Sequence, residues 1–146
     1  MKHANPMTLS AICLAGLMAA GSAANAAQPA ATAKLPPEMK QGNITYMSGG
    51  IGKGEAAAMR HEESRFPLTL EFLKREKAKN EYLAGVSVKI ADHEGKTVLD
   101  TLTGGPFLLA KLPDGKYTVT ADDHGKQKER TVVVAANKKE RVVFEW

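Results

Sequence analysis

A glycine-rich stretch at residues 49–54 holds the residues whose types and spacing come closest to ligand chemistry. It lies between a run expected to form a strand and a run expected to form a helix. Glycines let backbone amides approach an anion closely, and a neighbouring lysine adds positive charge. We therefore name a candidate interaction or anion site for a carboxylate or phosphate: Gly49, Gly50, Gly52, Lys53 and Gly54. The same glycines would let the chain turn tightly and close one end of the domain, and from sequence alone we favour that structural interpretation.

The stretch from Gly52 to Ala57 also satisfies the G-x-G-x-x-A pattern of dinucleotide-binding loops. In such folds the loop opens a helix inside a parallel βαβ unit. Here the following segments read as hairpin-like strands instead. We therefore predict no nucleotide cofactor, and no cofactor of another kind.

Residue spacing points to neither catalysis nor a metal site. His61-Glu62-Glu63 is not H-E-x-x-H because position 65 is Arg65, and His93 and His124 are each expected in a polar turn. Ser48 precedes a glycine but lacks the G-x-S-x-G frame of a nucleophile elbow. We predict a protein that is not an enzyme and binds no metal.

The charge balance is mildly basic, with 20 Lys and Arg against 16 Asp and Glu. The basic residues cluster at 74–79, 126–130 and 138–141, where glutamates interleave with them. These clusters lack the aromatic residues on which bases stack. We interpret them as solvated surface and predict no nucleic-acid partner.

The first 26 residues are predicted to be a signal peptide. Leu9 to Ala20 is an apolar run too short to span a membrane, and Ala24-Asn25-Ala26 is a small-x-small cleavage site. Cleavage near Ala26 would place the protein in the periplasm, or outside the cell, and would remove Cys13, the only cysteine. We expect no transmembrane segment in the mature chain and a disordered, Ala/Pro-rich spacer at 27–41.

Residues 42–146 are predicted to form one β-sandwich domain. Residues 42–67 are expected to give a first strand, the glycine-rich loop and a short helix over Glu55–Glu63. From Leu68 onward, apolar residues alternate with polar ones in short runs separated by turn residues. This pattern is typical of antiparallel sheets packed face to face. The fold class is therefore all-β: an antiparallel seven-stranded, immunoglobulin-like or prealbumin-like sandwich with one short helix near its N-terminal end.

Three runs in the second half of the chain are similar to a known family: Gly95-Lys96-Thr97-Val98, Gly105-Pro106-Phe107-Leu108-Leu109, and Leu112-Pro113-Asp114-Gly115-Lys116-Tyr117-Thr118-Val119. They resemble the transthyretin-like, carboxypeptidase regulatory-like domains. Small secreted proteobacterial proteins of this family also look similar over the Gly-Gly-Ile-Gly stretch and the helix after it. The resemblance implies a prealbumin-like sandwich that serves as an accessory domain without chemistry of its own.

These observations favour a periplasmic, non-enzymatic module that contacts another periplasmic or envelope protein. An edge strand or the segment Gly49–Glu63 would make the contact, and we favour Gly49–Glu63 because its glycines cost folding entropy and a plain connector could be shorter. The alternative is a small-ligand or anion binder that uses the glycine-rich loop at 49–54.

Overall fold

The computed structural model describes residues 34–146. The predicted signal peptide, Cys13 and residues 27–33 of the predicted spacer lie outside the described residues. No helix among residues 34–146 has the length and apolarity that crossing a bilayer requires.

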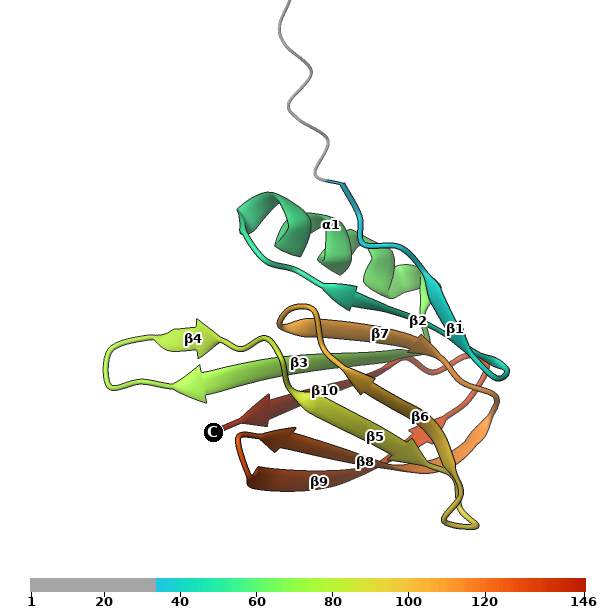
Figure 1. The fold of residues 1–146 in the computed structure, drawn as a ribbon. Coiled ribbons are helices and arrows are strands. Elements are labelled where there is room, and N and C mark those ends of the chain that lie inside the picture. The colour runs from blue at the N-terminus through green and yellow to red at the C-terminus, as the bar shows by residue number, and fades with distance from the viewer. Residues whose placement is uncertain (1–33) are drawn as a thin grey trace, which may run out of the picture. The chain divides into compact units, whose positions relative to one another are not determined.

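Two β-sheets face each other across the main core (Figure 1). The first sheet has six strands in the order β1-β2-β7-β3-β10, with β4 paired to β3, and the second has the order β6-β5-β8-β9. The strands are β1 (Met39–Gln41), β2 (Ile44–Gly49), β3 (Leu68–Arg75), β4 (Asn80–Tyr82), β5 (Ser87–Ala91), β6 (Thr97–Leu102), β7 (Phe107–Lys111), β8 (Gly115–Asp123), β9 (Lys126–Val134) and β10 (Glu140–Glu145).

The main core forms because alternate residues of each strand point between the sheets. On β3 these are Leu68, Leu70 and Phe72, and all three are fully buried. The second sheet contributes Val88, Ile90, Val119 and other residues to the same hydrophobic cluster. The predicted period-two alternation from Leu68 onward therefore matches the packing.

The helix α1 (Lys53–Glu62) and the short 3₁₀ helix η1 (Glu63–Arg65) follow β2 and lie near the outer face of the first sheet (Figure 1). The helix buries Met59 completely, and the sheet and adjoining loops supply the other members of a second apolar cluster, Met47, Phe66, Phe107 and Leu109. Both faces of the first sheet are thus covered over part of its area. The helix α1 therefore covers part of the outer face of the first sheet and also connects β2 to β3.

Glu71 shows how completely this outer face is covered. It lies on the outer side of β3 but is only 6% exposed. Arg141 of β10 donates hydrogen bonds to Glu71 and to both carboxylate oxygens of Glu63 in η1. Burial lowers the pKa of the Arg141 guanidinium, but the two carboxylates outweigh it and the pKa is raised. This network satisfies the buried acid and fastens the end of the helical segment to the sheet.

Tyr117 and Pro113, both in the run Leu112–Val119, are joined by a hydrogen bond. The Tyr117 hydroxyl donates to the carbonyl oxygen of Pro113, four residues upstream, over 2.7 Å. A tyrosine that closes back onto upstream backbone is a common corner in β-sandwiches. Burial, together with Asp92 and Asp114, raises the pKa of the Tyr117 hydroxyl.

The all-β sandwich with one short N-terminal helix is confirmed. The strands number ten and not seven, and two of the three additional ones are the three-residue strands β1 and β4 of the first sheet. The sandwich is also not purely antiparallel, since β10 runs parallel to β3 from Glu140 beside Leu68 to Glu145 beside Leu73. The spacer predicted at 27–41 ends inside the fold, because residues 39–41 form β1 on β2.

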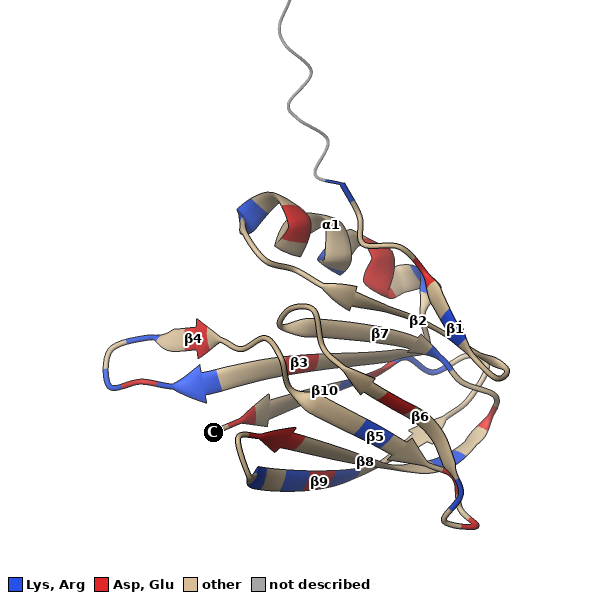
Figure 2. Cartoon of the chain, viewed as in Figure 1, with Lys and Arg blue, Asp and Glu red and all other residues tan. Residues whose placement is uncertain are grey.

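The predicted basic clusters lie among acids. Figure 2 shows basic and acidic segments interleaved along β9 and around the β3–β4 hairpin. Lys74 pairs with Glu76, and Arg75 makes a two-pronged contact with Glu145. Such exposed pairs add little stability and leave a mixed, solvated surface.

Candidate functional site

The glycine-rich loop is where the chain leaves the first sheet. β2 ends at Gly49, opposite Phe107 of β7. Gly50 then turns with a φ of +105°, and a Cβ on it would lie 2.4 Å from Cδ2 of Phe107. A Cβ on Gly105 would lie 2.4 Å from the carbonyl carbon of Gly49. Tight packing alone therefore accounts for glycine at positions 50 and 105.

An internal carboxylate already occupies part of the predicted anion site. The amide of Gly50 donates to Oε1 of Glu55 over 2.7 Å. An external carboxylate or phosphate would have to displace Glu55 to use that amide. The loop is consequently a poor anion cradle by its backbone alone.

The five predicted site residues separate in the structure. Gly50, Gly52 and Lys53 line a cavity beside the loop. Gly49 is buried in its pairing with β7, and Gly54 lies in the first turn of α1, outside the cavity lining.

The cavity between the start of α1 and the end of β4 is the candidate functional site. Its volume is about 480 Å³. Apolar side chains supply most of its wall, and Arg60, Lys53 and Tyr82 supply the polar groups. The lining residues are Gly50, Ile51, Gly52, Lys53, Ala56, Arg60, Tyr82, Leu83, Ala84 and Pro106.

Arg60 is held in place at this cavity. Its Nη2 donates to the hydroxyl oxygen of Tyr82 over 2.9 Å. Its guanidinium carbon lies 5.4 Å from the centroid of the Phe107 ring, and the Tyr82 and Phe107 rings are 6.1 Å apart. Cation–π attraction and the hydrogen bond together limit the rotamers of a long, flexible side chain.

The strand β4 extends the line of β7 along one edge of β3. Phe72 donates its amide to the carbonyl of Pro106 over 2.9 Å and accepts from the amide of Leu83 over 3.1 Å. The N–H and C=O of one strand residue point to the same side, so Pro106 and Leu83 lie on the same edge of β3. Because Leu83 donates inward to β3, the backbone groups of the preceding Tyr82 point outward, away from β3.

A strand position beside β4 is consequently open. Along β7 this position is filled by β2, which ends at Gly49. Beyond Gly49 the chain rises into α1, while β4 continues the line of β7. Among residues 34–146, β4 pairs only with β3. The cavity lies at this junction, since Gly50 and Tyr82 both line it.

The two cations at the cavity differ from three of the other four arginines of the described fold and share with Arg130 of β9 the lack of a close carboxylate. Arg65, Arg75 and Arg141 each pair with a glutamate. Within the described part of the chain, no carboxylate oxygen comes within 4.0 Å of the charged nitrogens of Arg60 or Lys53. The cavity therefore carries a positive field that this part of the fold does not neutralise at close range.

Sequence reasoning did not find Arg60, Tyr82, Leu83 or Ala84. The available signal was a lone aromatic residue, Tyr82, three positions after the basic cluster at 74–79, which we interpreted as solvated surface. Tyr82 is 50% exposed and Ile51 is 64% exposed, so two large apolar side chains stand at the mouth of the cavity. Exposed apolar groups that cluster in this way often mark a contact surface.

A second hollow of about 510 Å³ lies at the β1–β2 turn. Three of its polar side chains, those of Gln41, Asp92 and Tyr117, are engaged within the fold. The Gln41 amide bonds to the backbone of Asp100 in both directions, and the Asp92 carboxylate accepts from two amides of its own turn. Tyr117 is also committed, to Pro113. The cavity at Arg60 is the better candidate because a mostly apolar wall there surrounds two cations that lack close carboxylate partners, whereas the second hollow has one cation, Lys96, in a more polar wall.

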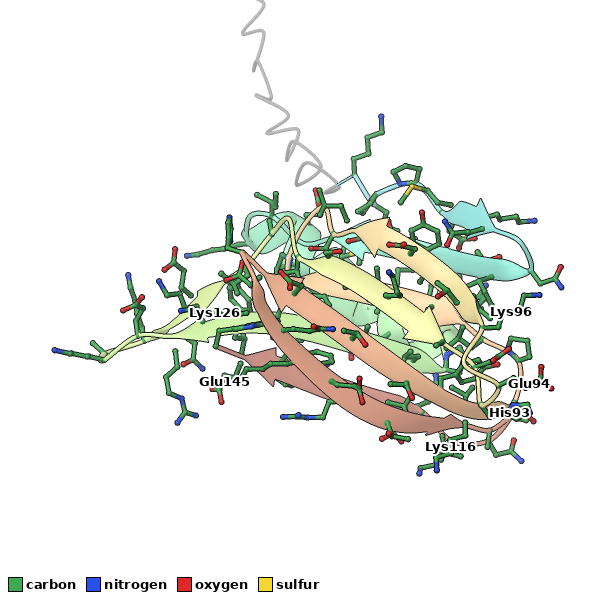
Figure 3. All side chains as sticks on the ribbon, turned by 60° about the horizontal axis from the view of Figure 1, so that its bottom comes forward. His93, Glu94, Lys96, Lys116, Lys126 and Glu145 are labelled. Carbon is green, nitrogen blue, oxygen red and sulfur yellow. The ribbon has the colours of Figure 1, made fainter. Side chains whose placement is uncertain are left out.

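The histidines of the described region lie apart and exposed. Figure 3 shows His93, with Glu94 and Lys96, at the opposite end of the molecule from Lys126 and Glu145. Among residues 34–146, no three His, Cys, Asp or Glu side chains gather as a metal site would need.

Comparison with protein-family models and with curated proteins gave no match for this chain.

Proposed function

We propose that this protein is a non-enzymatic binding module that holds an extended segment of another protein beside β4. The open strand position next to Tyr82, with a cavity at its end, is the observation that carries the proposal. A strand added there would hydrogen-bond to the outward backbone groups of Tyr82. Such pairing supplies affinity, and a pocket for a side chain supplies specificity.

The chemistry of the cavity supports binding over catalysis. Its polar side chains are two cations, Arg60 and Lys53, and the Tyr82 phenol. These groups suit holding a negative charge better than moving a proton at neutral pH. In this proposal the partner is a periplasmic or envelope protein, in keeping with the predicted leader and the resemblance to accessory transthyretin-like domains.

A small amphipathic anion is the second candidate occupant. The volume of about 480 Å³ favours it, because pockets for small ligands span roughly 300–1,000 Å³. The exposed rim formed by Ile51 and Tyr82 favours the protein segment, since a small ligand would leave these side chains in water.

Photocrosslinking in intact cells tests the proposal. A photoreactive amino acid replaces Ile51 at the cavity mouth, and the control position is Val133, an exposed apolar residue on β9. A protein adduct should form at position 51 and should be lost when Ala84→Trp fills the strand position. The matched Ala136→Trp change, in the turn before β10, should leave the adduct unchanged. Equal adducts at 51 and 133, or an adduct insensitive to Ala84→Trp, would contradict the proposal.

A further inference from the structure

The open strand position is closed at one end by the protein itself. β2 occupies the same line up to Gly49, and the next residues, Gly50 and Ile51, line the cavity together with Tyr82 before α1 begins. A strand laid beside β4 must therefore stop or turn away at the glycine-rich loop. A chain terminus meets this constraint without a bend.

The charge at the closed end selects between the two kinds of terminus. We call the open strand position beside β4, together with the cavity at its closed end, the groove. Arg60 and Lys53 line the cavity, and no carboxylate of residues 34–146 comes within 4.0 Å of their charged nitrogens. The Glu55 carboxylate lies on the Gly50 amide beside the cavity, but it is more than 4.0 Å from both of these charged groups and is not part of the lining. Among the lining side chains an α-amino group would meet two like charges, whereas an α-carboxylate would meet two opposite ones. The field therefore favours a C-terminus.

The Arg60 side chain is already positioned to bind a carboxylate. A guanidinium has five N–H donors, and the Tyr82 hydroxyl accepts from one nitrogen, Nη2. The Phe107 ring supports the guanidinium at 5.4 Å. Because the side chain is already held, less conformational entropy is lost when a carboxylate binds to the remaining donors.

The cavity wall indicates which kind of side chain suits the last residue of the bound segment. Ile51, Ala56, Leu83, Ala84 and Pro106 present apolar surface around the cations. An aliphatic or aromatic side chain would remove this surface from water.

We infer that the groove captures the free C-terminus of another protein, with an apolar last residue in the cavity and its carboxylate on Arg60 and Lys53. The bound segment runs parallel to β4, because its end lies at Ala84 and its preceding residues lie toward Asn80. This inference rests on the proposed function and specifies its ligand.

Two peptide pools test it against the full mature chain. Both contain N-acetylated hexapeptides with five random positions and Val, Leu or Phe last. One pool ends in a free carboxylate and the other in a carboxamide. Backbone amide chemical shifts of Tyr82, Ala84 and Gly50 are followed in ¹⁵N-labelled protein. The carboxylate pool should shift them, and the carboxamide pool should bind about tenfold more weakly or worse.

Variants assign the effect to the guanidinium. Arg60→Gln should abolish the preference for the carboxylate pool. Arg130→Gln is the matched control, since Arg130 also lies over an aromatic ring, Phe144, at 5.9 Å, but on β9. Arg130→Gln should leave the preference intact. Circular dichroism and melting confirm that both variants are folded.

The outcomes separate the inference from the function on which it rests. Equal binding of the two pools at Tyr82 would overturn carboxylate capture and leave strand capture standing. If decanoate bound as tightly as the carboxylate pool and did not shift the Tyr82 amide, the ligand would be a small amphipathic anion and not a peptide. No shift with either pool would contradict both proposals.

Discussion

The hydroxyl oxygen of Tyr82 lies 2.9 Å from Nη2 of Arg60, so a side chain of β4 fixes a cation that α1 carries. This contact joins the two walls of the groove. It places the charge at the end of an open strand position, where neither the helix nor the strand alone would hold it.

Tyr82→Phe should therefore weaken binding of the carboxylate peptide pool about threefold to tenfold, the range expected for one hydrogen bond. Binding of the carboxamide pool should change little, because the apolar contacts remain. Titration of the Ala84 amide shift measures both. Equal loss with the two pools would show that the hydroxyl supports the groove as a whole and does not act through Arg60.

Met59→Ala should lower the free energy of unfolding by about 2–4 kcal/mol, because Met59 is fully buried between α1 and the first sheet. Met39→Ala is the matched control. Met39 lies on β1 and is 37% exposed, so its loss should cost under about 1 kcal/mol. Urea unfolding of both variants makes the comparison. Similar losses of unfolding free energy in the two variants would mean that α1 is not packed tightly against the first sheet.

Two adjacent glycines before β7 should respond differently to alanine. A Cβ on Gly105 would meet Gly49 backbone atoms at 2.4 Å, whereas a Cβ on Gly104 would come no closer than 3.5 Å to Ser48. Gly105→Ala should destabilise the fold by about 1–3 kcal/mol, and Gly104→Ala should cost little. Thermal melting of both variants tests this. A cost at Gly104 equal to that at Gly105 would contradict the close approach of the two loops.

Tyr117 should make stability depend on alkaline pH. Its pKa is raised above the unfolded value of 10.0 by burial and by Asp92 and Asp114. A raised folded-state pKa means that its contribution is complete below pH 10.0 and is lost as the pH rises through the folded pKa. Tyr117→Phe should be less stable at pH 8, because it lacks the hydrogen bond to Pro113, and should lose less stability above pH 10. Parallel slopes for the two proteins in urea unfolding at pH 8–11 would contradict this.

The strand pattern could be predicted because several strands of the main core, including β3, β5 and β8, alternate by period two. Leu68, Leu70 and Phe72 already identify the inner face of β3. The sequence could not show that the opposite face is covered as well, since Thr69 and Glu71 look like solvent-facing residues. Their burial depends on α1 and on the distant Arg141, which are tertiary effects.

The missed features are short or distant in sequence. β4 has three residues, Asn80 to Tyr82, and pairs only because β3 presents the edge that remains beyond β7. The parallel pairing of β10 with β3 joins segments about 70 residues apart, and no local pattern encodes it.

The candidate site was predicted in part. The glycine-rich loop does border the cavity through Gly50, Gly52 and Lys53. Its sequence could not reveal that Glu55 takes the Gly50 amide, or that Arg60 and Tyr82 would meet beside it.

Amide hydrogen exchange at Tyr82 tests strand capture most directly. In the free protein the Leu83 amide, bonded to Phe72, should exchange slowly, and the outward Tyr82 amide should exchange quickly. At a saturating concentration of the carboxylate peptide pool, we predict that exchange at Tyr82 slows at least tenfold as it gains a strand partner. Saturated binding with Tyr82 still exchanging at its free rate would contradict the account.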